Sequence, residues 1–206
     1  MKKLIVCLLA VMLVLASATC AFADIDYSQW NSSSVYPSDV INTTLAKPVI
    51  WLVDNKIVDG YDDGLFHADW NITRAQFAKM MLIATNNQND MASYSSRNTF
   101  SDTTSHWAHD YIEVAAAKGF INGYGDGTFK PDDNVSYVEA VAIFCRMRGI
   151  SVNDSAAAWP NNYIQQARLS NLYAQTQTVT NWTTADWNEP ASREDIAWLL
   201  YRNLPK

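Results

Sequence analysis

Three segments of the chain carry hydrophobic residues at helical spacing, and each begins with the same polar signal. The signal is a Thr or Ser followed three residues later by Gln, Glu or Asp. This is the pattern of a capping box, in which the hydroxyl accepts from the N3 amide and the N3 side chain reaches back to the cap. The boxes are Thr73–Gln76, Ser136–Glu139 and Ser192–Asp195, and the apolar stripes behind them are Phe77, Ala78, Met81 and Leu82; Val141, Ile143, Phe144 and Met147; and Ile196, Leu199 and Leu200. The pattern predicts three amphipathic helices, with the third box the weakest because Asp is short.

The residues before these helices also repeat. The stretch 60–66 returns 63 residues later as 123–129, with Gly, Tyr, Asp, Gly and Phe at the same places. A worn third copy places Trp159 at 52 residues after Trp107. Each unit therefore combines a first helix, a turn-rich loop and a capped second helix.

The second unit shows this organisation most clearly. Residues 107–118 predict a first helix, and Gly119 stands where a helix C-terminus favours a positive φ. The Gly- and Asp-rich stretch 123–134 is then the loop that leads to the Ser136 cap.

Three helices presented in the same way bury their stripes most simply against one another. We therefore expect an all-α fold of three helix-loop-helix repeats, with rough threefold symmetry around a central three-helix core. The predicted boundaries are a signal peptide at 1–23 and repeats at 24–90, 91–150 and 151–206, the last one degenerate, with 85–98 as a polar linker.

The N-terminal residues are predicted to be a secretory signal. Lys2 and Lys3 precede an apolar run that is too short to span a bilayer comfortably, and residues 21–23 (AFA) fit a small-x-small cleavage site. Cleavage there removes two of the three cysteines and leaves Cys145, which we expect to be buried as a small apolar residue.

The chain is acidic and rich in aromatic residues. Its formal charge is −6, and cleavage lowers Lys+Arg from 15 to 13 against 21 Asp+Glu, so the charge becomes −8. Nucleic acids and anionic membrane surfaces are poor partners for such a chain, because they are bound by basic patches. Eight Trp and ten Tyr supply flat amphipathic rings that suit sugar faces as well as cores.

Taken together, the motifs resemble those of the S-layer homology (SLH) domain family, namely F-S-D, W-A, a G-x-x-x-G-Y-x-D-G-x-F-x-P loop and T-R-A-E. The second unit carries Phe-Ser-Asp at 100–102, Trp-Ala at 107–108 and the loop from Gly119 to Pro131, and the first unit carries Thr-Arg-Ala-Gln at 73–76. The resemblance covers almost all of the chain after the predicted signal, from about residue 39 to residue 203.

The resemblance implies a three-pronged, all-helical pseudo-trimer without catalysis. Family members attach bacterial surface proteins to cell-wall polymers, often an anionic secondary polysaccharide bearing pyruvate ketals, and in some lineages modified peptidoglycan. Grooves between the prongs hold the ligand, and the Arg of T-R-A-E is prominent among the contacts. The implied location is outside the cell, on the bacterial wall.

Arg74 and Arg193 are the predicted contacts to an acidic group. Both occupy the first helical position after a cap, where we expect free backbone amides and the helix dipole to favour an anion. A guanidinium there adds a planar fork for a carboxylate or phosphate. The alternative is an exposed helix-start arginine that pairs with a nearby Asp.

The sequence departs from the family pattern in all three units. Tyr137 replaces the arginine of the second unit, so that groove either lacks the anion contact or stacks Tyr137 on a sugar. In the first unit His67 stands at the usual basic position and Gln76 at the usual Glu, and the third unit has lost its loop. We therefore expect one or two working grooves.

Four further residues are candidates for shaping the glycan site. The turns at Gly64 and Gly127 would let the backbone approach a sugar. Asp39 and Asp102 more simply cap the first helices or brace the groove arginine.

Trp107 and its counterpart Trp159 offer two interpretations. They are possible sugar platforms, but their equivalent placement at the start of first helices favours packing in the core. Trp107 is retained as a candidate glycan contact.

Other chemistry finds little support in the sequence. An EF-hand starting at Asp59 would have Tyr61 at its third position and Trp70 at its twelfth, which removes two ligands. The three His lack metal-site spacing, and nucleophile and phosphate-loop motifs are missing, so we predict no metal, no cofactor and no enzyme. A second hypothesis is a structural or adaptor surface protein that acts through protein–protein contacts.

Overall fold

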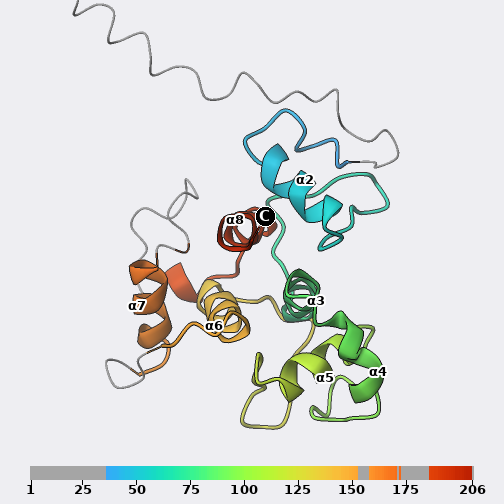
Figure 1. Ribbon diagram of the computed structural model, residues 1–206, viewed down its shortest axis with the longest axis vertical. Helices are drawn as coiled ribbons and strands as arrows, with labels where there is room; N and C mark the ends of the chain where they lie inside the picture. The colour runs from blue at the N-terminus through green and yellow to red at the C-terminus, as the bar shows by residue number, and fades with distance from the viewer. Residues whose placement is uncertain (1–35, 153–157, 171, 173–185, 206) are drawn as a thin grey trace, which may run out of the picture. The chain divides into compact units, whose positions relative to one another are not determined.

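The computed structural model describes residues 36–152, 158–170, 172 and 186–205. Over these residues the fold is all-α, as predicted, and its only β structure is three isolated bridges (Figure 1). The helices are α2 (Ala46–Asp54), α3 (Arg74–Ala84), η2 (Gln88–Asp90), α4 (Met91–Tyr94), α5 (His109–Ala117), α6 (Tyr137–Met147), α7 (Asn161–Leu169), η3 (Asp186–Asn188) and α8 (Arg193–Asn203). The predicted signal peptide and the altered loop of the third unit lie outside the described residues.

The second helices α3, α6 and α8 begin at the predicted caps. Thr73 accepts from the amide of Gln76 at 3.2 Å, and the Gln76 side chain accepts from the Thr73 amide at 3.0 Å. Ser136 forms the same reciprocal box with its own N3 residue. The Ser192 hydroxyl also accepts from the N3 amide, while the shorter Asp195 carboxylate accepts from that hydroxyl. The predicted stripes behind all three caps are buried, with Met147 at their margin.

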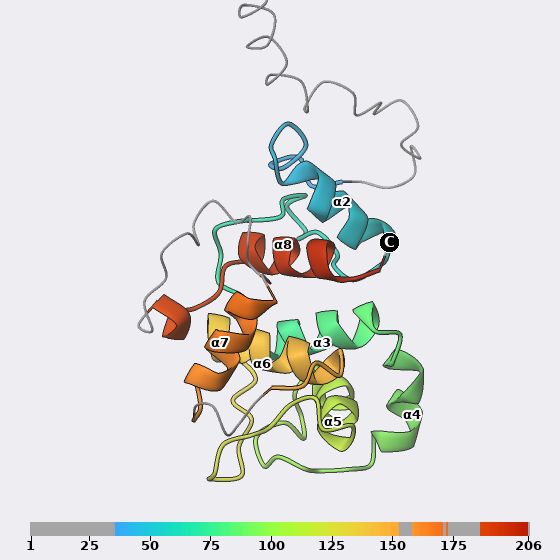
Figure 2. The same cartoon turned by 60° about the vertical axis from the view of Figure 1, so that its left-hand side comes forward.

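Each second helix packs against a first helix of a neighbouring unit. α3 contacts α5, α6 contacts α7, and α8 contacts α2. Figure 1 shows α3, α6 and α8 almost end-on in the middle of the described part, with α2, α5 and α7 outside them, and Figure 2 shows the same helices from the side. A threefold symmetry of this arrangement stays a prediction.

Isolated antiparallel bridges join the cap segments of the three units in cyclic order. They connect the first unit to the second, the second to the third, and the third back to the first. The pairs are Thr73 with Asn134, Ser136 with Pro190, and Asn71 with Ser192. Each helix start is therefore fixed by the chain of another unit.

The outer elements contain one feature that was not predicted and one prediction that is wrong. The polar linker at 85–98 contains η2 and α4, because Met91 and Tyr94 pack against the core one helical turn apart. The core-packing interpretation of the two tryptophans fails, since Trp107 is 57 % exposed and Trp159 is 52 % exposed. α5 and α7 begin two residues after them, so both rings lie on the turns that precede the helices.

The interior is otherwise built as expected. Cys145 is buried within α6, as predicted for an apolar role. Among the residues that the structure describes, none of the helices has both the length and the apolar character needed to cross a bilayer.

Candidate ligand-binding site

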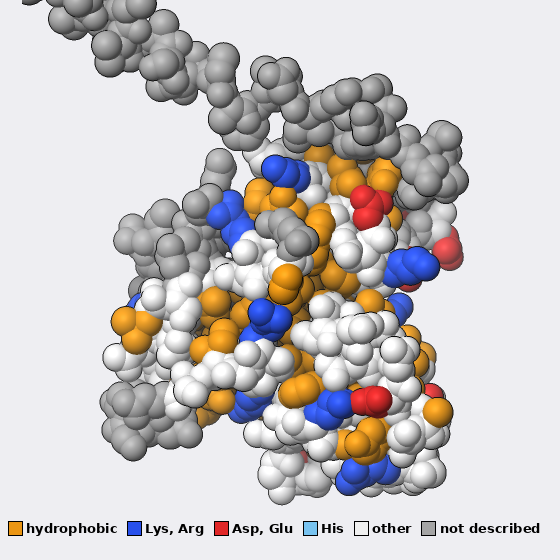
Figure 3. Space-filling model, in the orientation of Figure 1, with side chains coloured by type: hydrophobic (Ala, Val, Ile, Leu, Met, Phe, Trp, Pro, Cys, Tyr) orange, Lys and Arg blue, Asp and Glu red, His pale blue; other side chains and the backbone are white. Residues whose placement is uncertain are grey.

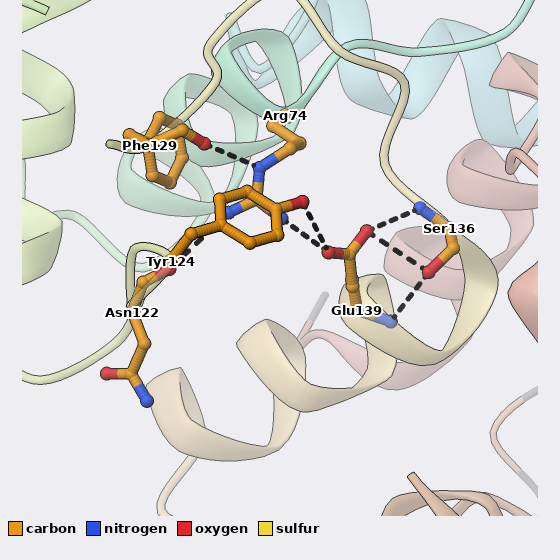
Figure 4. A network of polar contacts seen from close by, with 6 residues as sticks. All are labelled: Arg74, Asn122, Tyr124, Phe129, Ser136 and Glu139. Atoms are coloured by element: carbon orange, nitrogen blue, oxygen red, sulfur yellow. Dashed lines mark hydrogen bonds and ion pairs between the residues drawn. The ribbon is translucent and has the colours of Figure 1, made fainter. Parts of the chain in front are cut away.

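Arg74 lies at the centre of a polar network at the start of α3 (Figure 4). Its Nε donates to the carbonyl of Phe129 at 2.9 Å, and its Nη1 donates to Glu139 Oε1 at 2.6 Å. Nη2 reaches the carbonyl of Asn122 at 3.4 Å. The guanidinium carbon lies 4.9 Å from the centroid of the Tyr124 ring and 4.6 Å from that of Phe129, and only 4 % of the residue is exposed. Arg74 therefore ties the loop of the second unit to α6.

The backbone amides at the helix starts are not free for an anion, so this part of the prediction is wrong. At α3 the Arg74 amide donates to the Asp133 carbonyl at 2.9 Å, and the Ala75 amide donates to Pro131. At α8 the amides of Arg193 and Glu194 are occupied in the same way by carbonyls of the first unit. The cyclic bridging brings these carbonyls to each helix start, and the sequence of one unit does not reveal this.

The alternative of a surface Arg–Asp pair is also wrong for Arg74. Its partner is the carboxylate of Glu139, and the two side chains are 5 % and 22 % exposed. The interaction is a largely buried ion pair whose acid also accepts from the Ser136 amide at 2.9 Å. Breaking one partner of such a pair is costly, because the other charge is left without compensation.

Asp102 and Asp39 fix the loops that hold the arginines. The Asp102 carboxylate accepts from the amides of Phe129 and Lys130 at 2.9 and 2.7 Å. Asp39 accepts from Phe66 and His67 at 2.8 and 2.9 Å in the first unit. The carbonyls of the two Phe then accept from the arginines, so both acids brace an arginine through the loop.

The capping role considered for these acids is wrong. α2 and α5 have Leu45 and Ala108 at their N-caps, without a side-chain cap bond. The acids lie earlier in the chain and turn instead toward the loop that follows the first helix.

Arg193 repeats the placement of Arg74 with a different charge balance. Its Nε donates to the Phe66 carbonyl at 2.8 Å, and its guanidinium carbon lies 4.8 Å from the Tyr61 ring and 4.5 Å from the Phe66 ring. Within the described part of the chain, no carboxylate forms an ion pair with it. Burial lowers the pKa of Arg193, and the nearby Tyr61 and Asp39 oppose that shift. Arg193 thus stays a cation without a directly bonded acid.

Tyr137 occupies the corresponding position of α6. Its hydroxyl donates to Asp195 Oδ2 at 2.5 Å, and the side chain is half-buried. Burial and then the hydrogen bond to Asp195 raise the pKa of this phenol. As with Arg74 and Glu139, the first residue of one second helix bonds the third residue of the next.

A cavity of about 570 Å³ opens between the second and third units. Arg74, Tyr124 and Glu139 line one part of it, and Arg146, Trp159 and Tyr163 line another. Gly123 also lines it, and a Cβ there would lie 2.3 Å from Phe100 Cε1, so the backbone runs too close to that ring for any side chain.

The other predicted residues lie away from this cavity. Gly64 and Gly127 have φ values of +76° and +83°, as the predicted turns require, but they do not line it. Trp107 does not line it either. Of the predicted site residues, the structure thus brings only Arg74 into this cavity. Arg193, Tyr137, the predicted turns, the acids and Trp107 are not among its lining residues, and Arg193 is only 6 % exposed.

Sequence reasoning missed Arg146 as a candidate. The available signal was its position seven residues after Glu139, which places both on one face of α6. The counterpart in α8 is Arg202, so the residue also repeats. Among the described residues, moreover, no three His, Cys, Asp or Glu side chains lie close enough together to hold a metal ion.

Known proteins that resemble the chain come from bacterial surfaces. It is 30 % identical over 185 residues to a "Middle cell wall protein" of Brevibacillus brevis, covering 89 % of this chain and 17 % of that protein. It is 37 % identical over 123 residues to "Cell surface glycoprotein 1" and 32 % identical over 125 residues to "Cellulosome-anchoring protein", both of Acetivibrio thermocellus. These alignments cover 56 % and 60 % of this chain, and 5 % and 28 % of the two relatives. The chain thus spans less than a third of each of the three.

The model of one protein family matches the chain in two places. The matched residues are 38–78 and 99–141, and each segment runs from before the first helix through the loop to the first turn of the capped second helix. They contain the Asp39 and Asp102 loops and the caps of α3 and α6 described above. The third repeat is not among the matched segments and stays a prediction. Through the two matched repeats, the chain belongs to the S-layer homology domain family.

Proposed function

We propose that the chain is a non-catalytic cell-wall-binding module of the bacterial envelope. Its ligand would be an anionic wall glycan, either a secondary polysaccharide bearing pyruvate ketals or a modified peptidoglycan. The names of its relatives support a wall or surface role, and the predicted signal at 1–23 supports secretion. The observation that carries the proposal is the cavity between the second and third units, where cations and aromatic rings meet.

The chemistry of the cavity suits an acidic sugar. A sugar ring has an apolar face that packs on flat aromatic side chains, and Tyr124, Trp159 and Tyr163 present such rings. Its acidic substituent requires a cation, which the acidic chain as a whole does not provide. Figure 3 shows hydrophobic side chains gathered over the middle of one face, with several Lys and Arg side chains beside them. Within the cavity the basic charge comes from Arg74 and Arg146.

The balance of charge favours Arg193 over Arg74 as a ligand contact. Glu139 neutralises Arg74 at 2.6 Å, so an incoming anion would have to compete with a carboxylate that is already in place. The residue of α3 that corresponds to Glu139 is the neutral Gln76. Arg193 therefore has no acid bonded to it among the described residues, and we assign it a contact of its own at the start of α8, outside the cavity that carries the proposal, where the residue is 6 % exposed.

The remaining candidates take supporting parts in this proposal. Asp39 and Asp102 hold the loops in place without touching the ligand, and Gly64 and Gly127 form the turns of those loops. Tyr137 replaces a charged contact with a hydrogen bond inside the protein. Trp107 offers an exposed ring outside the described cavity.

Co-sedimentation with purified cell walls tests the proposal. The protein is mixed with walls before and after acid extraction of their secondary polymer, and the bound fraction is measured. We expect binding to intact walls and its loss after extraction. A protein that stays in the supernatant with both preparations would contradict a wall-binding function. Retention on extracted walls would instead point to peptidoglycan.

Light scattering separates the proposal from the adaptor hypothesis. A monomer that binds walls by itself has no need of a second protein. If binding requires another surface protein to be present, the adaptor function is the better description.

The Arg193→Gln variant should bind intact walls about tenfold more weakly, since it loses one charge-assisted contact. Arg148→Gln, at the exposed end of α6, is the control.

A further inference from the structure

Arg146 is a cation of this cavity, and it is paired with no acid among the residues that the structure describes. It lies in the last turn of α6 and is partly exposed. Its guanidinium carbon lies 5.3 Å from the centroid of the Tyr163 ring, and no carboxylate of the described residues forms an ion pair with it. Both Arg146 and Tyr163 line the cavity.

The described lining of the cavity therefore has a net positive charge, and it comes from one residue. Within the described lining the charged residues are Arg74, Glu139 and Arg146. The first two form an ion pair and cancel, and Arg74 has only 4 % of its surface exposed. Arg146 thus supplies the charge that an incoming anion would meet.

The fold places the Arg74–Glu139 pair and Arg146 at different points along α6. Glu139 and Arg146 are seven residues apart, which is about 10 Å along the axis of α6. Ala142 and Ile143 line the cavity between them. The arrangement suits an extended ligand that lies along the helix, with its acidic group at the Arg146 end.

Aromatic side chains surround that end of the cavity. The Arg146 guanidinium carbon lies over the Tyr163 ring, and the guanidinium donates no hydrogen bond to another described residue, so its N–H groups can act as a fork for a carboxylate. Trp159 meets Tyr163 edge to face, with ring centroids 5.5 Å apart, and it is 52 % exposed. A flat ring beside a free guanidinium matches the apolar face and the acid of one sugar residue.

We propose that Arg146 binds the acidic group of the ligand in this cavity and that Trp159 carries the attached sugar ring. Arg74 is then a positioning residue that holds the loop and α6 together. The ligand class is a saccharide with a carboxylate substituent. This inference rests on the proposed wall-binding function and names the residue that recognises the acid within it.

The test compares Arg146→Gln with Arg148→Gln, which removes the same charge two residues further on at an exposed position. Binding to intact walls is measured by co-sedimentation over a range of protein concentrations. We expect Arg146→Gln to raise the apparent Kd about tenfold and Arg148→Gln to leave it within about twofold. Arg146→Lys should fall between them, because Lys keeps the charge and loses the fork. Circular dichroism confirms that each variant is folded.

A second measurement identifies the acid. The carboxyl groups of the walls are reduced to alcohols with carbodiimide and borohydride before binding. The wild-type protein should then bind about tenfold more weakly, whereas Arg146→Gln should respond to the reduction by a clearly smaller factor, because only the contact at Arg193 is left to lose. A purely structural role of Arg146 would not remove this sensitivity.

The outcomes separate the inference from the function on which it rests. If the wild-type protein does not bind walls, the proposed function fails. If it binds walls and Arg146→Gln binds equally well, the function stands and the assignment of Arg146 is overturned. Equal loss of binding on carboxyl reduction in both proteins also overturns it, since the acid would then be recognised elsewhere.

Discussion

Arg74 and Arg193 occupy the same position in two repeats, and their surroundings differ in one decisive respect. Each donates its Nε to a loop phenylalanine carbonyl, and each lies between that phenylalanine and a tyrosine ring. Arg74 then reaches Glu139, whereas Arg193 has no carboxylate bonded to it among the described residues. The same helix position therefore holds an arginine in an internal ion pair at Arg74 and an arginine without a bonded acid at Arg193.

The third equivalent position shows what this contact does when the arginine is missing. Tyr137 donates its hydroxyl to Asp195, so a neutral hydrogen bond replaces the ion pair between consecutive second helices. Two of the three positions thus form a side-chain hydrogen bond to the next second helix, and the donor of this bond can be either charged or neutral. We infer that holding the repeats together is the general role of the position and that anion binding is an added one.

The largest expected effect comes from removing the paired arginine. Arg74→Ala should lower the free energy of unfolding by about 3–5 kcal/mol, because it leaves a largely buried carboxylate and two loop carbonyls without their donor. Urea denaturation followed by circular dichroism measures this. Arg193→Ala should cost less, since no acid is left behind. A loss below about 1 kcal/mol for Arg74→Ala, equal to that of the exposed Arg148→Ala, would show that the ion pair does not join the units.

A smaller loss of stability is expected when the aspartate that holds either of the two equivalent loops is removed. Asp102→Ala and Asp39→Ala should each cost about 1–2 kcal/mol, because each removes a charged acceptor from two loop amides near the surface. The same denaturation experiment applies, with Asp102→Asn as the variant that keeps one acceptor oxygen. Clearly unequal costs would mean that the two repeats do not use this acid in the same way.

One substitution can give Arg193 an acidic neighbour like the one that Arg74 has. Gln76→Glu introduces an acid at the position that corresponds to Glu139, and Glu still completes the capping box with Thr73. We expect wall binding to weaken about tenfold, or about 1.4 kcal/mol, with little change in stability. Unchanged binding would mean that the charge of Arg193 does not reach the ligand.

The opposite exchange is the matched control. Glu139→Gln releases Arg74 from its partner, so it should lower stability and leave binding unchanged or improved. A fall in binding for this variant would indicate that Glu139 itself touches the ligand.

Local patterns in the sequence were sufficient to predict the capped second helices. The caps at Thr73, Ser136 and Ser192, and the buried stripes behind them, depend on residues three to four positions apart, which a single unit contains. The repeat of 63 residues predicted the shared loop and the paired acids Asp39 and Asp102. These features follow from helix geometry and turn chemistry alone.

The contacts between units were not predictable in this way. The carbonyls that occupy the amides of Arg74 and Arg193 come from other repeats, and so does Glu139. Arg146 and Trp159 line one cavity although they belong to different units, and their positions in the sequence do not indicate that they lie close together. The helical Met91 and Tyr94 were hidden in a polar segment because two apolar residues are too few to show a period.

The smallest expected effect concerns Tyr137 and appears only at high pH. Burial and Asp195 raise the pKa of Tyr137 above the ordinary value of about 10, so the folded protein keeps the phenolic proton after the unfolded chain has lost it. Stability from this residue is then fully present below pH 10 and falls as the pH rises above it. The slope is at most about 1.4 kcal/mol per pH unit, and less here because the half-buried group keeps some solvent contact. Urea denaturation between pH 9 and 11 should therefore show a shallower decline for Tyr137→Phe than for the wild-type protein. Parallel declines would mean that the phenol titrates equally in both states, and that the bond to Asp195 does not hold α6 to α8 in solution.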